Sequence, residues 1–384
     1  MRLRQMLPFL LIVLAIVGSL CWYMASRTLA LSPLFARHPA WVYGFFIAFL
    51  GLQFCTPLMH RIPFLTHRLD GLYWITYGLM SLVSMYFVFL VGSDLVQWVA
   101  RRWFHAPTVF GQYALFAAMA LASLSTLLGL IYVLMPVPLH RVEVPIADLP
   151  PQLDGFRIVQ ISDLHLGPMA REDQVTRIAA LTRAQRPDLV AITGDLVDSE
   201  ADGTRAKAAL LRDLGARHGV CFITGNHEYY SGASRWLELF RSFGWHVLQN
   251  GHEVMDHDGA SLVVIGMPDP AARFGRAGSG SGPDLDLALA GAPAQGTRIL
   301  LFHQPLGYRE AEAADVKLQL SGHTHGGQYF PWTLLVRRIF AHPVGLHAFK
   351  RMWIYTSPGT GFWGPPNRFM MPPELTLLTL KRID

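Results

Sequence analysis

The sequence is poor in cysteine, and its N-terminal part lacks lysine altogether. Only three cysteines occur in 384 residues. Cys21 and Cys55 lie in long apolar stretches and Cys221 in a short apolar run, so no disulfide framework indicates an oxidising compartment. Residues 1–150 contain nine arginines, no lysine and four acids, whereas residues 151–384 hold 23 basic and 23 acidic residues. The basic pI of about 9.2 therefore describes the N-terminal part. Without a basic cluster interleaved with aromatics in the C-terminal part, we expect no nucleic-acid partner.

Charge is missing from four long apolar stretches in the N-terminal part. Each contains at least the roughly 20 residues that a helix needs to cross a bilayer. The four stretches are Met6–Ser26, Pro39–Met59, Gly71–Ser93 and Phe110–Pro136. We therefore expect a multi-pass protein of the inner or plasma membrane, with a four-span transmembrane anchor over residues 1–139 and the lipid bilayer as a partner. Because these stretches hold no Asp, Glu, Lys, Arg or His, an anchor is favoured over a transporter.

An even number of spans places both chain ends on one side of the membrane. Five arginines would lie on that side and four on the other. The five are Arg2, Arg4, Arg61, Arg68 and Arg141. This small excess favours a cytoplasmic C-terminal domain.

The pattern changes near His140, where short apolar runs begin to alternate with amphipathic segments. We expect strands at residues 156–161, 188–193, 219–224, 261–266, 297–302 and 317–320. Helical periodicity is found at residues 171–183, 206–214 and 285–290, the last inside a Gly-, Ala- and Ser-rich loop over residues 271–296 that we expect to be mobile and near the site. Strands alternating with helices predict an α/β domain with much parallel sheet, over residues 140–384.

Polar clusters follow the expected strands at their carboxyl ends, where layered α/β domains bind ligands. The clustered donors are Asp163, His165, Asp195, Asn226, His303, His323 and His325. Carboxylate, amide and imidazole ligation without thiolate favours Mn²⁺, with Fe or Zn²⁺ as alternatives, over Ca²⁺ or a cysteine-type zinc site. Seven donors exceed one ion's requirement. They predict two divalent ions bridged by Asp195, an arrangement used in phosphoryl hydrolysis.

Five ordered motifs carry a family resemblance: SDLHLG, TGDLVD, TGNHE, FHQP and SGHTHGG. Together they resemble the signatures of the calcineurin-like metallophosphoesterases. The resemblance implies a layered α-β-β-α domain, a β-sandwich flanked by helices. It implies one metal on Asp163, His165, Asp195 and His325, and a second on Asp195, Asn226, His303 and His323. His227 would be catalytic, assisting the leaving oxygen, and Asn226 and His227 would contact the phosphate.

Two further segments are similar to the bacterial membrane-associated branch of that family, namely Pro151–Gly167 and Arg368–Leu380. That branch includes phosphodiesterases and UDP-2,3-diacylglucosamine hydrolases of lipid A synthesis. The resemblance implies a phosphodiester or pyrophosphate substrate, including a lipid-linked one. The alternatives are a phosphomonoesterase such as a phosphoprotein phosphatase, or a non-catalytic membrane scaffold that retains its metal site.

An apolar segment directly follows the last motif and supplies one hint about the substrate. It contains Trp332 and Phe340, which we expect to contact an acyl chain or the bilayer surface. The alternative is that these side chains pack in the core.

Overall fold

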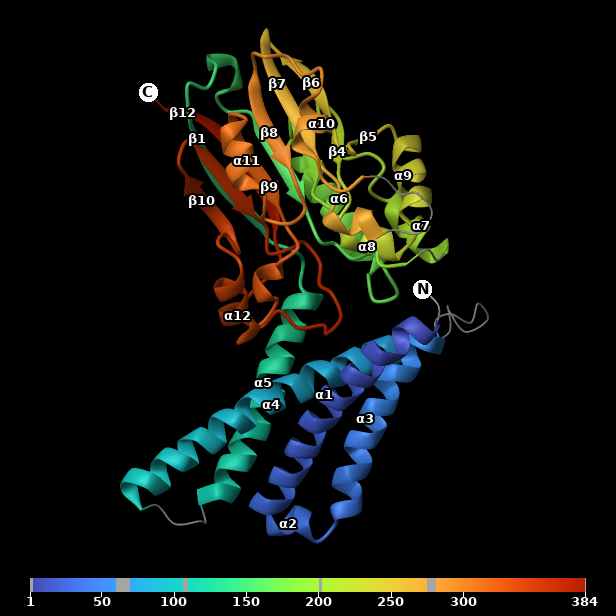
Figure 1. Cartoon of the computed structure of the whole chain (residues 1–384), viewed down its shortest axis with the longest axis vertical. Coiled ribbons are helices and arrows are strands. Elements are labelled where there is room, and N and C mark those ends of the chain that lie inside the picture. Colours follow the sequence, from blue (N-terminus) through green and yellow to red (C-terminus); the bar gives the residue numbers. More distant parts are fainter. Residues whose placement is uncertain (1–2, 60–69, 106–109, 200–201, 275–280, 384) are drawn as a thin grey trace. The chain divides into compact units, whose positions relative to one another are not determined.

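The computed structural model describes residues 3–59, 70–105, 110–199, 202–274 and 281–383. It divides into two compact units (Figure 1). The first comprises the described part of Met1–Leu130 together with Gly364–Asn367, and the second the described part of Ile131–Trp363 and Arg368–Asp384.

The first unit is helical. Its helices are α1 (Leu3–Leu31), α2 (Pro33–Ala36), α3 (Pro39–Met59), α4 (Asp70–Phe104) and most of α5 (Phe110–Leu134). Within the described residues, four of them (α1, α3, α4 and α5) are long and apolar enough to cross a membrane. This confirms the four predicted spans. The small residues Ala118 and Ala122 of α5 are buried, as expected where helices approach closely in a bilayer.

Two of these helices continue beyond the predicted uncharged stretches and include charged residues there. Arg27 lies in α1 and Asp94 in α4, and their side chains form an ion pair of 2.6 Å. The hydroxyl of Tyr23, one turn before Arg27, donates to the same carboxylate at 2.7 Å. Because the two charges neutralise one another, neither stands alone in the apolar surroundings.

The second unit contains two six-stranded sheets within its described residues. The first sheet has the order β1 (Leu139–Ala147), β12 (Leu375–Ile383), β2 (Arg157–Ile161), β3 (Leu189–Ile192), β4 (Val220–Phe222) and β5 (His246–Val247). The second has the order β10 (Gly345–Phe349), β11 (Met352–Thr356), β9 (Val316–Ser321), β8 (Thr297–Leu301), β7 (Ala260–Gly266) and β6 (Gly251–His257). Strands β2 to β5 run parallel, as do β7, β8, β9 and β11.

The sheets pack face to face. Alternate side chains of one strand point to opposite faces, so Ile158 of β2 packs between the sheets while Val159 packs on the outer face. Helices α6 (Glu172–Ala184) and α9 (Ala233–Ser242) contribute buried side chains to the outer face of the first sheet. Helices α10 (Leu285–Leu289) and α11 (Tyr308–Ala313) do so on the second, where Figure 1 shows α11 over β9. The predicted α-β-β-α sandwich is confirmed.

Short helices occupy the loops around this sandwich. They are η1 (Pro151–Leu153), α7 (Asp202–Ala209), α8 (Asn226–Tyr230), η2 (Pro270–Phe274), η3 (His325–Gly327) and α12 (Trp332–Ile339). The predicted loop over residues 271–296 contains η2 and α10, and its residues 275–280 lie outside the described part. Of the cysteines, Cys21 and Cys221 are buried, and all three are free.

Candidate metal centre

All the predicted metal ligands follow the carboxyl ends of parallel strands, either in loops or at the start of the short helices α8 and η3. These strands are β2, β3 and β4 in the first sheet and β8 and β9 in the second. The loops are joined by backbone hydrogen bonds, such as Asp163 N–H to the Gly194 carbonyl at 3.0 Å and Gly322 N–H to the His303 carbonyl at 2.8 Å. The backbone N–H of His323 also donates to Oδ1 of Asp163 at 3.0 Å, so loops 160 residues apart in sequence, one from each sheet, meet at one place.

One group of donors consists of Asp163, His165 and His325, all buried, with ligand atoms within 4.8 Å of one another. Nε2 of His325 lies 3.4 Å from Oδ1 of Asp163 and 3.0 Å from Nε2 of His165. Three ligand atoms converging at this range can hold a divalent cation.

A second group consists of Asp195, His303 and His323, whose ligand atoms also lie within 4.8 Å of one another. Oδ2 of Asp195 lies 3.2 Å from Nε2 of His303 and 3.9 Å from Nε2 of His165, so this carboxylate faces both groups. Asn226 joins the second group, because its side-chain oxygen lies 3.1 Å from Nδ1 of His323.

His303 provides the clearest test of whether a cation fits. Its Nδ1 hydrogen bonds to the Thr193 carbonyl at 2.7 Å, which fixes the proton on that nitrogen. Its buried Nε2 faces Asp195 without hydrogen-bond geometry and has no hydrogen-bond partner among the described residues. Buried nitrogens are rarely left unpaired. A ring nitrogen that faces a carboxylate, with the other ring nitrogen held by a backbone carbonyl, is the arrangement of a metal-binding histidine.

The charges of the cluster also favour a cation. Burial alone would lower the pKa of His303, but Asp195 and Asp163 outweigh it and hold that pKa well above its usual range. The pKa of His165 is raised in the same way. Burial lowers it, but Asp198 and Asp195 outweigh burial and raise it to about 9. Despite burial, His303 and His165 hold the pKa of Asp195 well below its usual range. The buried carboxylates therefore draw positive charge into this place.

The backbone is strained at the same positions. Among the described residues, five of the predicted ligands have left-handed φ angles between 49° and 68°: Asp163, His165, Asp195, His323 and His325. Such conformations cost on the order of 1–3 kcal/mol each and cluster at functional sites. Neighbouring glycines leave room for the carboxylates: a Cβ on Gly225 would lie 2.2 Å from Asp195 Oδ1, and one on Gly322 2.1 Å from Asp163 Oδ2.

His227 lies beside both groups and forms a third with His165 and Asp195. Its backbone N–H donates to Oδ1 of Asp195 at 2.8 Å, and its Nδ1 lies 2.7 Å from Oδ1 of Asp198. The side chain is part-exposed, which leaves Nε2 as the nitrogen able to meet a ligand.

Sequence reasoning missed two carboxylates that organise the site. Asp198 also contacts Nδ1 of His165, at 2.7 Å. The carboxylate of Glu228 accepts backbone N–H groups of Asp195 and Gly225 at 3.0 and 2.6 Å. Burial and Asp195 raise the pKa of Glu228 to about 7. The sequence motifs could have indicated both residues, because Asp198 ends TGDLVD and Glu228 ends TGNHE.

Arg368 was likewise missed as part of the site. Its fully buried guanidinium donates to the carbonyls of Pro358 and Gly361 at 2.7 and 3.0 Å. It also lies 3.1 Å from Nδ1 of His325. This contact holds the ring of His325 with its Nε2 towards Asp163. Arg368 is the first residue of Arg368–Leu380, the C-terminal segment that is similar to the membrane-associated branch of the family.

The predicted substrate contacts lie close to the site in the chain or in space. Phe340 is half-buried, with its ring centroid 6.1 Å from that of His323. Trp332 is half-buried at the start of α12, five residues after η3. Neither belongs to the buried clusters of the sandwich. Two exposed rings, Tyr230 and Trp363, lie 5.4 and 5.5 Å from the ring of His227. Sequence reasoning missed Tyr230.

Comparison with known proteins agrees with this geometry. Residues 156–327 match the family model described as calcineurin-like phosphoesterase. The chain is 36% identical over 272 residues to a Danio rerio transmembrane protein with metallophosphoesterase domain, covering 69% of this chain and 62% of that protein. A Bos taurus protein of the same description is 35% identical over 300 residues, covering 75% and 67%. An uncharacterized metallophosphoesterase of Aquifex aeolicus is 34% identical over 233 residues, covering 60% and 87%.

These matches settle the family, although the chain spans less than two thirds of the Danio rerio relative. They confirm a metallophosphoesterase domain and a membrane protein. The chain is a member of the calcineurin-like phosphoesterase family.

Proposed function

We propose that this protein is a membrane-anchored phosphohydrolase with two divalent metal ions that cleaves a phosphodiester or pyrophosphate bond. The buried Nε2 of His303, 3.2 Å from Oδ2 of Asp195 while Nδ1 is held by the Thr193 carbonyl, is the observation that carries the proposal. A vestigial site would have no reason to keep this buried imidazole aimed at a buried carboxylate, because burying such groups costs free energy.

The residues present fit two ions. Asp163, His165, Asp195 and His325 would hold one, and Asp195, Asn226, His303 and His323 the other. We expect Mn²⁺, with Fe or Zn²⁺ as alternatives. When bound, the ions supply Lewis acidity at the phosphoryl group.

The remaining chemistry belongs to the side chains beside the ions. Asn226 and His227 would contact the phosphate, and His227 would give a proton to the leaving oxygen. Asp198, 2.7 Å from Nδ1 of His227, would hold that nitrogen's proton and so orient Nε2.

A lipid-linked substrate, of the kind represented by UDP-2,3-diacylglucosamine, is the finer part of the proposal. Helix α12 follows η3 and exposes Leu334, Leu335 and Ile339. Phe340 extends this apolar surface towards His323. An acyl chain that moved there from water would gain about 0.8 kcal/mol per buried methylene. The proposal also places the boundary between the membrane anchor and the catalytic domain at residues 139/140. It places the catalytic domain on the cytoplasmic side of the membrane.

The test is hydrolysis by the purified full-length protein, reconstituted with Mn²⁺, Fe²⁺ or Zn²⁺, on diesters, pyrophosphates and monoesters with and without acyl chains. We expect cleavage of diesters or pyrophosphates that Asp195→Ala abolishes. Cleavage of monoesters alone would make the protein a phosphomonoesterase. A fully metal-loaded protein inactive on the whole panel would instead favour a scaffold.

A further inference from the structure

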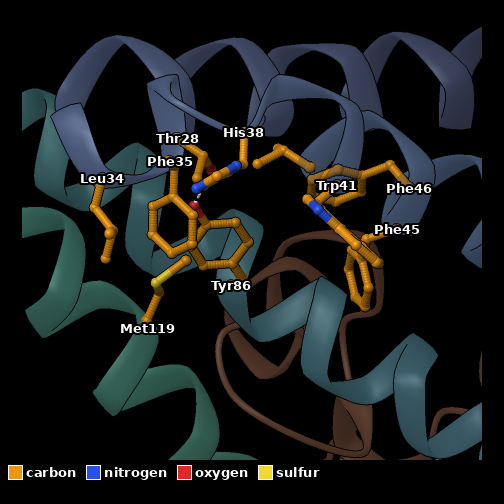
Figure 2. Close-up of a pocket in the computed structure, with 10 residues that line it drawn as sticks. Thr28, Leu34, Phe35, His38, Trp41, Phe45, Phe46, Tyr86 and Met119 are labelled. Atoms are coloured by element: carbon orange, nitrogen blue, oxygen red, sulfur yellow. Dashed lines mark hydrogen bonds between the residues drawn. The ribbon is translucent and has the colours of Figure 1, made fainter.

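The helical unit contains a cavity of about 520 Å³, and the sites considered above make no use of it. Figure 2 shows it among α1, the α2–α3 turn, α4 and α5. Its size lies in the roughly 300–1,000 Å³ range of ligand pockets and far exceeds the volume of one water, about 30 Å³.

The wall of the cavity is built for hydrocarbon. Phe35, Phe45, Phe46 and Met119 contribute aromatic and thioether surface. Two polar side chains in the wall, Thr28 and Tyr86, have their hydrogen bonds satisfied within the protein.

The pairing of these two hydroxyls can be followed atom by atom. Thr28 donates its hydroxyl proton to the Met24 carbonyl at 2.7 Å, so Tyr86, at 2.5 Å, donates to Thr28. Figure 2 draws the Thr28–Tyr86 bond. Because both protons are already used, the inner wall offers a ligand no free donor. An apolar occupant therefore fits better than a polar one.

The surroundings supply that occupant. The cavity lies among helices long and apolar enough to cross a membrane, where the medium is lipid hydrocarbon. A void would forfeit the dispersion contacts of its lining atoms. Water would find few partners, because the hydroxyls are already paired. A lipid chain can enter from the side and restore the lost contacts.

One end of the cavity is polar and the other apolar, as an amphiphile requires. His38 and Trp41 line it at the turn between α2 and α3, and Trp41 is 80% exposed. Tryptophan favours the interface between bilayer and water. Tyr86 lies near the middle of α4 and Met119 well inside α5, so the cavity extends from a helix turn towards the interior of the bundle. Exposed Arg37, next to His38, adds positive charge at the turn.

We infer that this cavity binds one acyl chain of a membrane glycerophospholipid, with the phosphate headgroup at Arg37 and His38. The imidazole of His38 can donate a hydrogen bond to a phosphate oxygen, and the guanidinium of Arg37 attracts the same anion. Since a lipid tail gains little by leaving other lipid tails, selection depends on packing in the aromatic wall and on the headgroup. This site is independent of the proposed hydrolysis.

The test is photocrosslinking of the full-length protein in nanodiscs made with phosphatidylglycerol that carries a diazirine on one acyl chain. Peptides would be mapped by mass spectrometry. We expect labelling concentrated on residues 34–46 and around Met119. Leu34→Trp, which enlarges a 55% exposed side chain at the cavity, should reduce it several-fold. Ile47→Trp is the matched control, since Ile47 is 69% exposed and outside the cavity.

A second measurement keeps the inference testable if a tryptophan variant folds poorly. Native mass spectrometry in mild detergent should show one phospholipid retained by the wild type and by His105→Ala, and lost more readily from His38→Ala. Uniform labelling of all exposed helix faces, unchanged by Leu34→Trp, would mean only the ordinary lipid annulus and would overturn the inference. Equal retention of the phospholipid by His38→Ala and His105→Ala would also overturn the inference.

Discussion

Nδ1 of His227 lies 2.7 Å from Oδ1 of Asp198, and the same oxygen lies 2.7 Å from Nδ1 of His165. One half-buried carboxylate thus holds both a proposed metal ligand and the proposed proton donor. Despite its burial, the two imidazoles lower the pKa of Asp198, so it stays ionised. Metal affinity and proton transfer are thereby coupled through one side chain.

Asp198→Asn should reduce kcat by about 10²–10⁴, because His227 loses the carboxylate that fixes its tautomer and orientation. Metal affinity should fall by a smaller factor of about 10–100, as for other residues that orient metal-binding histidines. Steady-state kinetics at saturating Mn²⁺ and metal titration separate the two effects. Asp173→Asn, at an exposed carboxylate on α6, is the control. An Asp198→Asn protein with normal kcat would remove the positioning role.

Asp195→Ala and His227→Ala should differ in metal content. Asp195 faces both donor groups, so its loss should leave both ions poorly held and abolish hydrolysis. His227→Ala should keep near-normal metal while kcat falls by about 10²–10⁴. Metal analysis of the purified variants tests this, since two tightly bound ions in Asp195→Ala would contradict the bridge. Metal loss in His227→Ala would instead make His227 a ligand.

Much of this site could be predicted from sequence because its ligands follow strands whose apolar runs are short and continuous. The predicted strands at residues 188–193 and 297–302 match β3 and β8 within one residue at each end. Strands β1, β5, β6, β10, β11 and β12 were not predicted. In β1 and β6 the reason is that LHRVEVPIA and GHEVMDH mix polar with apolar residues, as edge strands do. The pairing of β1 with β12, more than 200 residues apart, depends on tertiary contacts that no local pattern records.

The positioning residues were harder to predict, for a different reason. Asp198, Glu228 and Arg368 act through hydrogen bonds to ligands or to their backbone, and a buried arginine has no sequence pattern of its own. The Arg27–Asp94 pair escaped prediction because each residue lies just beyond an uncharged stretch. Only the longer helices of the structure bring the two together.

Arg368→Met should destabilise the catalytic unit and disturb the site. It would leave the buried carbonyls of Pro358 and Gly361 without their donor, at about 1–3 kcal/mol per unpaired group. Arg368→Lys should restore only part of the lost stability, because one ammonium group cannot make all the hydrogen bonds of the planar guanidinium. Thermal unfolding of the metal-loaded proteins measures the effect, with Arg351→Met as an exposed control. An unchanged Tm would show that water replaces the guanidinium.

A chain beginning at Pro136 should fold and hydrolyse a small soluble diester at close to the full-length rate, if the spans only anchor. A chain beginning at Val142 should be less stable. It lacks buried Val137 and the strand pairing of Leu139, His140 and Arg141 with β12. Circular dichroism and thermal unfolding compare the two chains. A well-folded but inactive Pro136 chain would show that the spans contribute to catalysis.

The dependence of rate on acyl length tests the lipid-linked substrate directly. Phe340 lies beside His323, and α12 exposes Leu334, Leu335 and Ile339. Four buried methylenes at about 0.8 kcal/mol each would raise kcat/KM by about 200-fold if their burial is kept in the transition state. We therefore expect kcat/KM to climb with chain length in the wild type. Trp332→Ala and Phe340→Ala should flatten that climb while turnover of chain-free substrate stays intact. Leu210→Ala, at an exposed apolar side chain beyond α7, should change neither. Equal cleavage of long-chain and chain-free substrates by the wild type would make a soluble phosphoester the better substrate, and would leave the proposed metal centre in place.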